Sequence, residues 1–148
     1  MKKSLLLEII SSLIVLMFVY AATSKLFNIP QFNFELHRQP LPKWSLPILL
    51  WSIPISEIAT SILLIMPKTR ALGFYGTLVL MISFSIYILL GILKVFDKVP
   101  CSCGGIIKYF NLREHLVFNL FFVLIAIIGL IIERKGMNNN AELSFSAQ

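Results

Sequence analysis

The sequence predicts an all-α membrane protein: a bundle of four transmembrane helices, with a short amphipathic outer helix between spans 1 and 2. Three observations support this fold class. The chain of 148 residues is 57% hydrophobic and only 14% charged, whereas a typical soluble domain has about 25% charged residues. It contains four apolar runs, each long enough to cross a hydrocarbon core of about 30 Å. These runs are continuous rather than alternating, which favours helices over the strands of a barrel.

The four predicted spans cover approximately residues 5–24, 44–66, 71–93 and 115–132, within one integral membrane domain at residues 1–135. So apolar a chain cannot form a soluble domain, because the surface of a small domain needs polar residues. The lipid bilayer is therefore its first expected partner. The first run also has the basic start of a signal peptide, but it contains Glu8 and lacks a clear cleavage site, which favours a membrane span. Residues 136–148 are polar and are predicted to form a disordered cytoplasmic tail.

The net charge of +6 lies in short basic clusters at the ends of the apolar runs. A nucleic-acid surface would need basic residues along one face of an element, so no nucleic-acid partner is expected. Basic residues near the ends of spans instead set the topology, and they are densest beside the short termini and the short connection between spans 2 and 3. These residues are Lys2, Lys3, Lys68, Arg70, Arg134 and Lys135. The outer side then holds seven basic residues that are spread over the two longer connections: Lys25, Arg38, Lys43, Lys94, Lys98, Lys108 and Arg113. The greater density of the first group predicts that both termini lie in the cytoplasm and that the two longer connections lie outside.

The first outer connection, "FNIPQFNFELHRQPLPKW", has the pattern of a short helix. Asn28 is a suitable N-cap and Pro30 suits the first turn. Ile29, Phe32 and Leu36 recur at helical spacing, which predicts a half-buried helix on the outer surface.

The second outer connection contains the only two cysteines of the chain, Cys101 and Cys103, followed by two glycines. Thiols this close form a disulfide only in a tight turn, which the glycines allow. Strain in such a small ring makes the bond a better oxidant than a structural disulfide. Lys98 and Lys108 favour the thiolate, which is the form that reacts and that binds metals. The residues alone leave a redox pair, a metal site and an inert pair open, and they favour the redox pair.

Glu57 is the only ionisable group near the middle of the second span. A carboxyl there is costly if it faces lipid, so it should face the interior of the bundle. Its role is either in a functional site or in a structural hydrogen bond between helices. The candidate hydrogen-bonding partners are hydroxyl groups of the second and third spans: Ser56, Thr60, Ser61, Ser83, Ser85 and Tyr87.

His115 opens the fourth span and shares a helix face with Asn119, four residues later. Three interpretations of this histidine are open. It is an interfacial residue that hydrogen-bonds among the headgroups, a proton donor or acceptor for thiol chemistry, or a third metal ligand beside the two sulfurs.

Together these segments resemble the MauE-type branch (methylamine utilisation protein MauE) of the DoxX-like family of four-helix membrane proteins. The resemblance rests on "YAATSKLFN" at the end of the first span, "PISEIATSILLI" in the second, and "PCSCGG" followed by "EHLVFN" at the fourth. It covers nearly the whole chain, up to about Arg134. Family members commonly have an aromatic residue before the glycine of the cysteine motif, whereas Gly104 follows Cys103 directly here.

The resemblance implies a bacterial inner-membrane protein that supports periplasmic thiol–disulfide chemistry, either as an oxidoreductase or as an accessory to one. Its partner would be a secreted, disulfide-containing protein or a thioredoxin-like protein. In this interpretation Cys101 and Cys103 are the redox pair, and Glu57 and His115 match polar positions that recur in the family. A link to methylamine metabolism does not follow from the resemblance.

One cysteine pair cannot relay electrons between two internal disulfides, so the electrons would pass to a quinone in the bundle or to a thioredoxin-like protein. Two rival functions remain. The first is a soft-metal-handling or small-solute transporter, in which Cys101, Cys103 and His115 would bind a metal ion. The second is a non-catalytic assembly subunit that holds a periplasmic partner.

Overall fold

The structure, a computed structural model, describes residues 2–93 and 112–146, with side chains described for residues 5–93 and 113–136. Its helices follow in the order α1 (Lys2–Phe27), α2 (Ile29–His37), the short 3₁₀ helix η1 (Lys43–Ser45), α3 (Leu46–Ile65), α4 (Arg70–Ile92) and α5 (Leu112–Ser146). Four segments are long and apolar enough to cross a membrane: Leu5–Phe27, Lys43–Ile65, Arg70–Ile92 and Arg113–Gly136. The predicted all-α fold with four spans is confirmed, and the predicted span ends fall within a few residues of these bounds.

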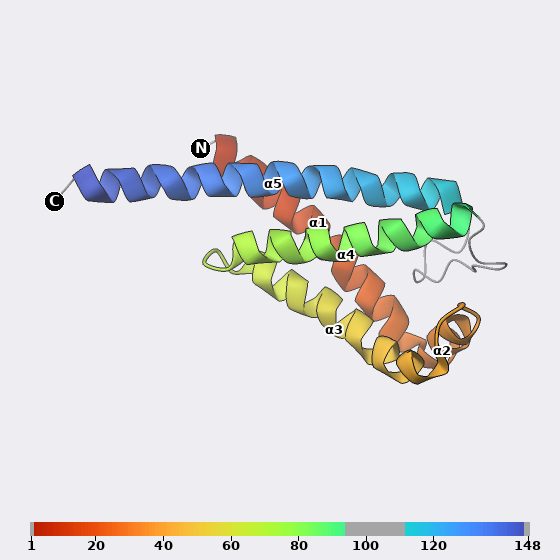
Figure 1. Cartoon of the computed structure of the whole chain (residues 1–148). Helices are drawn as coiled ribbons and strands as arrows, with labels where there is room; N and C mark the ends of the chain where they lie inside the picture. The colour runs from red at the N-terminus through yellow and green to blue at the C-terminus, as the bar shows by residue number, and fades with distance from the viewer. Residues whose placement is uncertain (1, 94–111, 147–148) are drawn as a thin grey trace.

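Successive spans run in opposite directions through the bundle (Figure 1). The N-terminus and the turn between α3 and α4 lie at one end, here called the N-terminal end. The helix α2, the end of α4 and the start of α5 lie at the other, here called the α2 end. α1 packs mainly against α3, and α4 packs mainly against α5, while contacts of α3 with α4 and of α1 with α5 join the two pairs.

The core is formed by one stripe of apolar residues on each long helix. On α1, Ile10, Ile14 and Phe18 recur at helical spacing and are buried. They belong to one cluster with Leu64 of α3, Phe74 and Met81 of α4, and Phe122 and Ala126 of α5. This cluster is continuous from α1 through α5.

The outside of the bundle is apolar as well. Leu16, Val79 and Leu124 are 69%, 65% and 59% exposed. A helix that is apolar on both its inner and its outer face is stable only where the surrounding solvent is also apolar. The protein is therefore a multi-pass membrane protein whose outer surface contacts the lipid bilayer.

The short helix expected between the first two spans is present as α2. Phe32 and Leu36 are buried, whereas Phe34 is 57% exposed. Asn28 occupies the N-cap position but makes no hydrogen bond with its side chain there. Because an aromatic ring also lies on the exposed side, the amphipathic character of this helix stays a prediction.

The last helix, α5, continues through Gly136 to Ser146. The disordered cytoplasmic tail expected at residues 136–148 stays a prediction. A single glycine costs a helix only about 1 kcal/mol relative to alanine, and no proline follows it in the chain. The sequence thus lacks a strong stop signal at this point.

Candidate functional site

Glu57 lies inside the bundle, and its partner is Lys25 of α1. The Lys25 Nζ donates hydrogen bonds to Glu57 Oε1 at 2.8 Å and Oε2 at 3.1 Å. It donates a third to the main-chain carbonyl of Ala21 at 3.2 Å. Lys25 is 5% exposed and Glu57 is 2% exposed. All three donors of the ammonium group are used, which is what a buried charge requires.

Helical spacing explains why these two side chains meet. Ile14, Phe18, Ala22 and Lys25 follow one another at intervals of three or four residues, and all four are buried. Lys25 therefore continues the core stripe of α1 into its last turn. On α3, Glu57 lies one turn after the buried Pro54, which has no amide proton to donate within the helix.

Five of the six hydroxyl groups expected as partners of Glu57 are bonded elsewhere. Four serines donate to main-chain carbonyls of their own helices rather than to the carboxylate: Ser56, Ser61, Ser83 and Ser85. Tyr87 donates to the side chain of Gln39, in the segment that follows α2. Serine commonly bonds to its own helix in this way, and such bonding is stronger where no water competes.

His115 and Asn119 are buried on one face of α5, at 2% and 4% exposed. The His115 ring lies close enough to Lys25 to interact with its charge. Lys25, Glu57 and His115 from α1, α3 and α5 therefore form one group, here called the polar cluster. One turn further along α5, the amide Nδ2 of Asn119 is buried without a hydrogen-bond partner.

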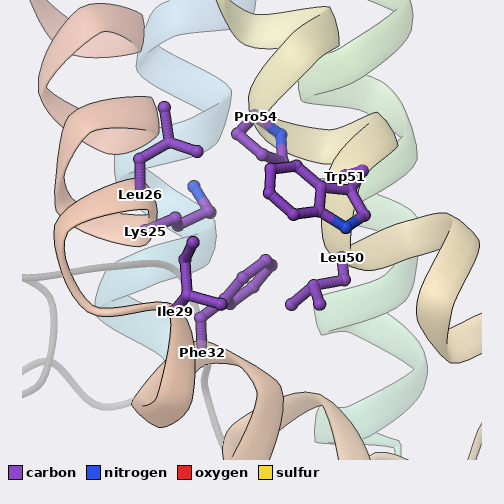
Figure 2. Close-up of a pocket in the computed structure, with 7 residues that line it drawn as sticks. All are labelled: Lys25, Leu26, Ile29, Phe32, Leu50, Trp51 and Pro54. Carbon is purple, nitrogen blue, oxygen red and sulfur yellow. The ribbon is translucent and has the colours of Figure 1, made fainter.

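A small recess beside Lys25 opens between α1, α2 and α3 at the α2 end of the bundle. Figure 2 shows Lys25 and Leu26 on one side, Trp51 and Pro54 on the other, and Phe32 across one end. The recess is shallow, with essentially no free volume for a ligand, and its lining is apolar apart from Lys25 and the indole N–H of Trp51. Trp51 is 51% exposed, so one wall of the recess reaches the lipid-facing surface.

Cys101 and Cys103 lie outside the described residues, so their thiol chemistry and a metal site that includes them both stay predictions. In sequence they fall between α4 and α5, and the end of α4 at Ile92 and the start of α5 at Leu112 both lie at the α2 end. Within residues 2–93 and 112–146, no group of three or more histidine, cysteine or acidic side chains is placed to hold a metal ion.

The pairing of Lys25 with Glu57 was not predicted from the sequence, in which Lys25 counts only as one of the basic residues on the outer side. Lysines near the end of a span usually extend to the membrane surface, so burial was not expected. The signal was present in the spacing. Extending the buried stripe of α1 by one more turn from Ala22 reaches Lys25, and the second span offers Glu57 as a counter-charge.

Comparison with known families assigns the chain to a family. The family model described as methylamine utilisation protein MauE matches residues 3–132, a region that contains the polar cluster and both cysteines. No curated protein and no solved structure matches the chain. Because the match extends over most of the 148 residues, this four-span membrane protein belongs to the MauE family.

Proposed function

We propose that this protein is an inner-membrane partner in periplasmic thiol–disulfide exchange, with Cys101 and Cys103 as the reacting pair. The position of His115 is the observation that carries the proposal. This histidine lies in the first turn of α5, twelve residues after Cys103, and it is buried near the Lys25–Glu57 ion pair. The cysteine connection thus leads directly into the polar cluster.

The proposed exchange has two steps. A thiolate of the partner attacks the Cys101–Cys103 disulfide, which forms a mixed disulfide and frees one thiolate of the pair. The second thiol of the partner then attacks the mixed disulfide, so the partner leaves with a new disulfide and the cysteine pair is reduced. Two electrons and two protons have passed from the partner to Cys101 and Cys103.

The polar cluster would serve the proton transfers of this exchange. Imidazole is the side chain best suited to accept and release protons near neutral pH. His115 therefore carries a proton to or from the thiols. Lys25 and Glu57, joined by two hydrogen bonds, fix the electrostatic environment of its ring.

The reduced pair must then lose its electrons, because no second cysteine pair exists in the chain. The acceptor is a quinone in the membrane or a soluble thioredoxin-like protein. The recess beside Lys25 is apolar and reaches the lipid-facing surface at Trp51. It has essentially no free volume for a ligand, so it does not favour the quinone over the thioredoxin-like acceptor.

The polar cluster also supports the orientation proposed from the basic residues, with both termini cytoplasmic. Of the seven lysines and arginines assigned to the outer side, Lys25 is neutralised by Glu57 inside the bundle. The outer side then keeps six such residues over two long connections, against six packed close to span ends on the inner side.

A membrane-impermeant thiol reagent should label Cys101 and Cys103 in intact cells after mild reduction. If the reagent labels the cysteines only after lysis, the orientation is opposite to the one proposed.

The decisive experiment traps the mixed disulfide. Cells carrying Cys101→Ser or Cys103→Ser alone are quenched with acid, alkylated and examined on non-reducing gels. In a single-cysteine variant the remaining thiolate attacks the disulfide of the oxidised partner, which is the reverse of the second step above, and no neighbouring thiol resolves the adduct. We therefore expect one of these variants to accumulate an adduct with a periplasmic protein that reductant dissolves, and the double variant to form none. If the wild-type pair stays reduced and is protected from alkylation only by added copper or zinc, the metal interpretation replaces this proposal.

The two histidines of the chain supply a matched control. His115→Ala should slow adduct formation by about 100-fold, the usual effect of losing a proton-transfer group. His37→Ala should leave the rate unchanged, because His37 is exposed on α2 and bonds to the main chain of its own helix. Equal rates for the two variants would remove the polar cluster from the mechanism.

A further inference from the structure

An open groove of about 500 Å³ lies between α1 and the C-terminal end of α3, at the N-terminal end of the bundle. The two helices meet at the Lys25–Glu57 ion pair and diverge toward this end (Figure 1). The groove is therefore at the opposite end of the bundle from the end of α4, the start of α5 and the recess beside Lys25. Nothing in the proposed thiol–disulfide chemistry uses it.

The lining of the groove changes from polar to apolar along α1. Glu8, Ser11 and Ser12 line its outer end, and Val15, Leu16 and Val19 line the part nearer the centre of the bundle. From Glu8 to Val19 the helix rises about 16 Å, at 1.5 Å per residue. This is about half of a hydrocarbon core of about 30 Å. The groove thus has the length and the polarity gradient of one leaflet of the bilayer.

Ser11 is the candidate contact for a polar ligand at the outer end. It is only 6% exposed, it lines the groove, and its hydroxyl has no hydrogen-bond partner. Other buried hydroxyls in the spans, those of Ser61, Thr77 and Ser85, each donate to the carbonyl four residues earlier in the same helix. Ser11 does not, so a buried donor and acceptor are left facing the groove without a partner from the protein.

The charged residues of the groove define the class of ligand. Glu8 and Arg70 both line it, and no ion pair joins these two described residues to each other. Arg70 Nε donates to the main-chain carbonyl of Leu64 at 3.4 Å, which holds the guanidinium at the turn between α3 and α4. A guanidinium is the side chain best shaped to bind a phosphate group, and a carboxylate binds an ammonium group.

We propose that this groove binds one zwitterionic phospholipid whose headgroup carries a primary ammonium. Its phosphate pairs with Arg70, its ammonium pairs with Glu8 and bonds to Ser11, and one acyl chain lies along the apolar part of the groove. An anionic glycerol headgroup would leave Glu8 without a positive partner. A choline headgroup has no N–H to donate to the carboxylate.

Native mass spectrometry of the purified full-length protein tests this site. Phosphatidylethanolamine, phosphatidylglycerol and phosphatidylcholine with identical acyl chains are added separately, and the bound fraction is measured. We expect phosphatidylethanolamine to bind about tenfold more tightly than the other two, the effect of one charge-assisted hydrogen bond. Glu8→Gln should abolish this preference, and Arg70→Gln should weaken all three lipids. Lys68→Gln, an exposed cation nearby that does not line the groove, is the matched control and should change nothing.

A preference for phosphatidylethanolamine that survives in Glu8→Gln would overturn the headgroup assignment. Leu16→Trp tests the groove itself, and the wild-type Leu16 is already 69% exposed, so the variant should fold. This substitution should displace the bound lipid by placing a large ring in the apolar part. If it instead leaves lipid binding intact, or turns a dimer into a monomer, the groove is not the lipid site. None of these measurements involves the cysteines, so they test the lipid site independently of the thiol–disulfide proposal.

Discussion

The helix α3 packs against its two neighbours by different means. Toward α1 it presents Glu57, which forms a buried ion pair with Lys25. Toward α4 it presents Leu64 and Thr60 to the small residues Gly73 and Gly76. Lipid tails are as apolar as the helix surfaces, so the hydrophobic effect does not drive helices together within a bilayer. Helices in a bilayer are therefore held together by polar bonds that lipid cannot replace or by close packing of complementary surfaces. In this protein α3 has a polar bond to α1 and close packing against α4.

Breaking the α1–α3 contact should have the largest effect on the stability of the protein. Glu57→Ala leaves the Lys25 ammonium buried without a counter-charge, and we expect it to lower the free energy of unfolding by about 3–5 kcal/mol. The measurement is a denaturant titration of the purified protein in detergent micelles. Glu35→Ala removes an acid on α2 that bonds to exposed Gln31, and as a control it should cost less than about 1 kcal/mol.

A double variant separates pairing from polarity. Lys25→Met combined with Glu57→Leu removes both charges and should recover most of the stability that Glu57→Ala loses, because similar apolar side chains can replace a buried ion pair. The same double variant should still lose the thiol–disulfide activity proposed above. If Glu57→Ala alone proves no less stable than Glu35→Ala, the ion pair does not hold α1 to α3.

Disturbing the α3–α4 contact should lower stability by an intermediate amount. A Cβ atom on Gly73 would lie 2.7 Å from the main-chain nitrogen of Leu64, which cannot rotate away. Gly73→Ala should therefore cost about 1–3 kcal/mol of stability, the range for overpacked cores. Gly136→Ala is the control, since nothing lies within 4 Å of a Cβ there, and it should stabilise α5 slightly. If both variants changed stability in the same direction, the cause would be the backbone conformation of glycine and not its packing against α3.

The smallest effect is expected at the hydrogen bond from Tyr87 of α4 to the side chain of Gln39. This bond ties the segment after α2 to the bundle. Tyr87→Phe should lower stability by about 1 kcal/mol, as for a typical hydrogen bond, and should speed proteolysis of that segment. Tyr20→Phe, at a side chain that is 42% exposed, should change neither. Equal proteolysis rates in the two variants would show that the bond does not anchor the segment.

The sequence predicted the parts of the fold that depend on continuous apolar runs. The four spans, the burial of Glu57 and the common face of His115 and Asn119 all follow from the cost of polar groups in lipid and from helical spacing. These are properties of one helix at a time. The structure describes them where the sequence placed them.

The sequence did not predict which groups meet between helices. Lys25 as the partner of Glu57 depends on how α1 and α3 pack, and a lysine in the last turn of a span ordinarily reaches the membrane surface. The hydroxyl groups were assigned to Glu57 because they are near it in sequence or in the next span, but main-chain carbonyls of their own helices lie closer.

The buried ion pair also has a consequence for how the chain enters the membrane during synthesis. Lysine and acidic residues each add about 2.5–3.5 kcal/mol to the insertion of a lone helix when they lie near its centre. Glu57 lies well inside its span, so α3 inserts poorly by itself, and its counter-charge arrives earlier on α1. We therefore expect α1 to stay beside the insertion machinery until the 32 residues that separate Lys25 from Glu57 have been made. The two helices would then leave for the lipid together, as a hairpin that is already neutral inside.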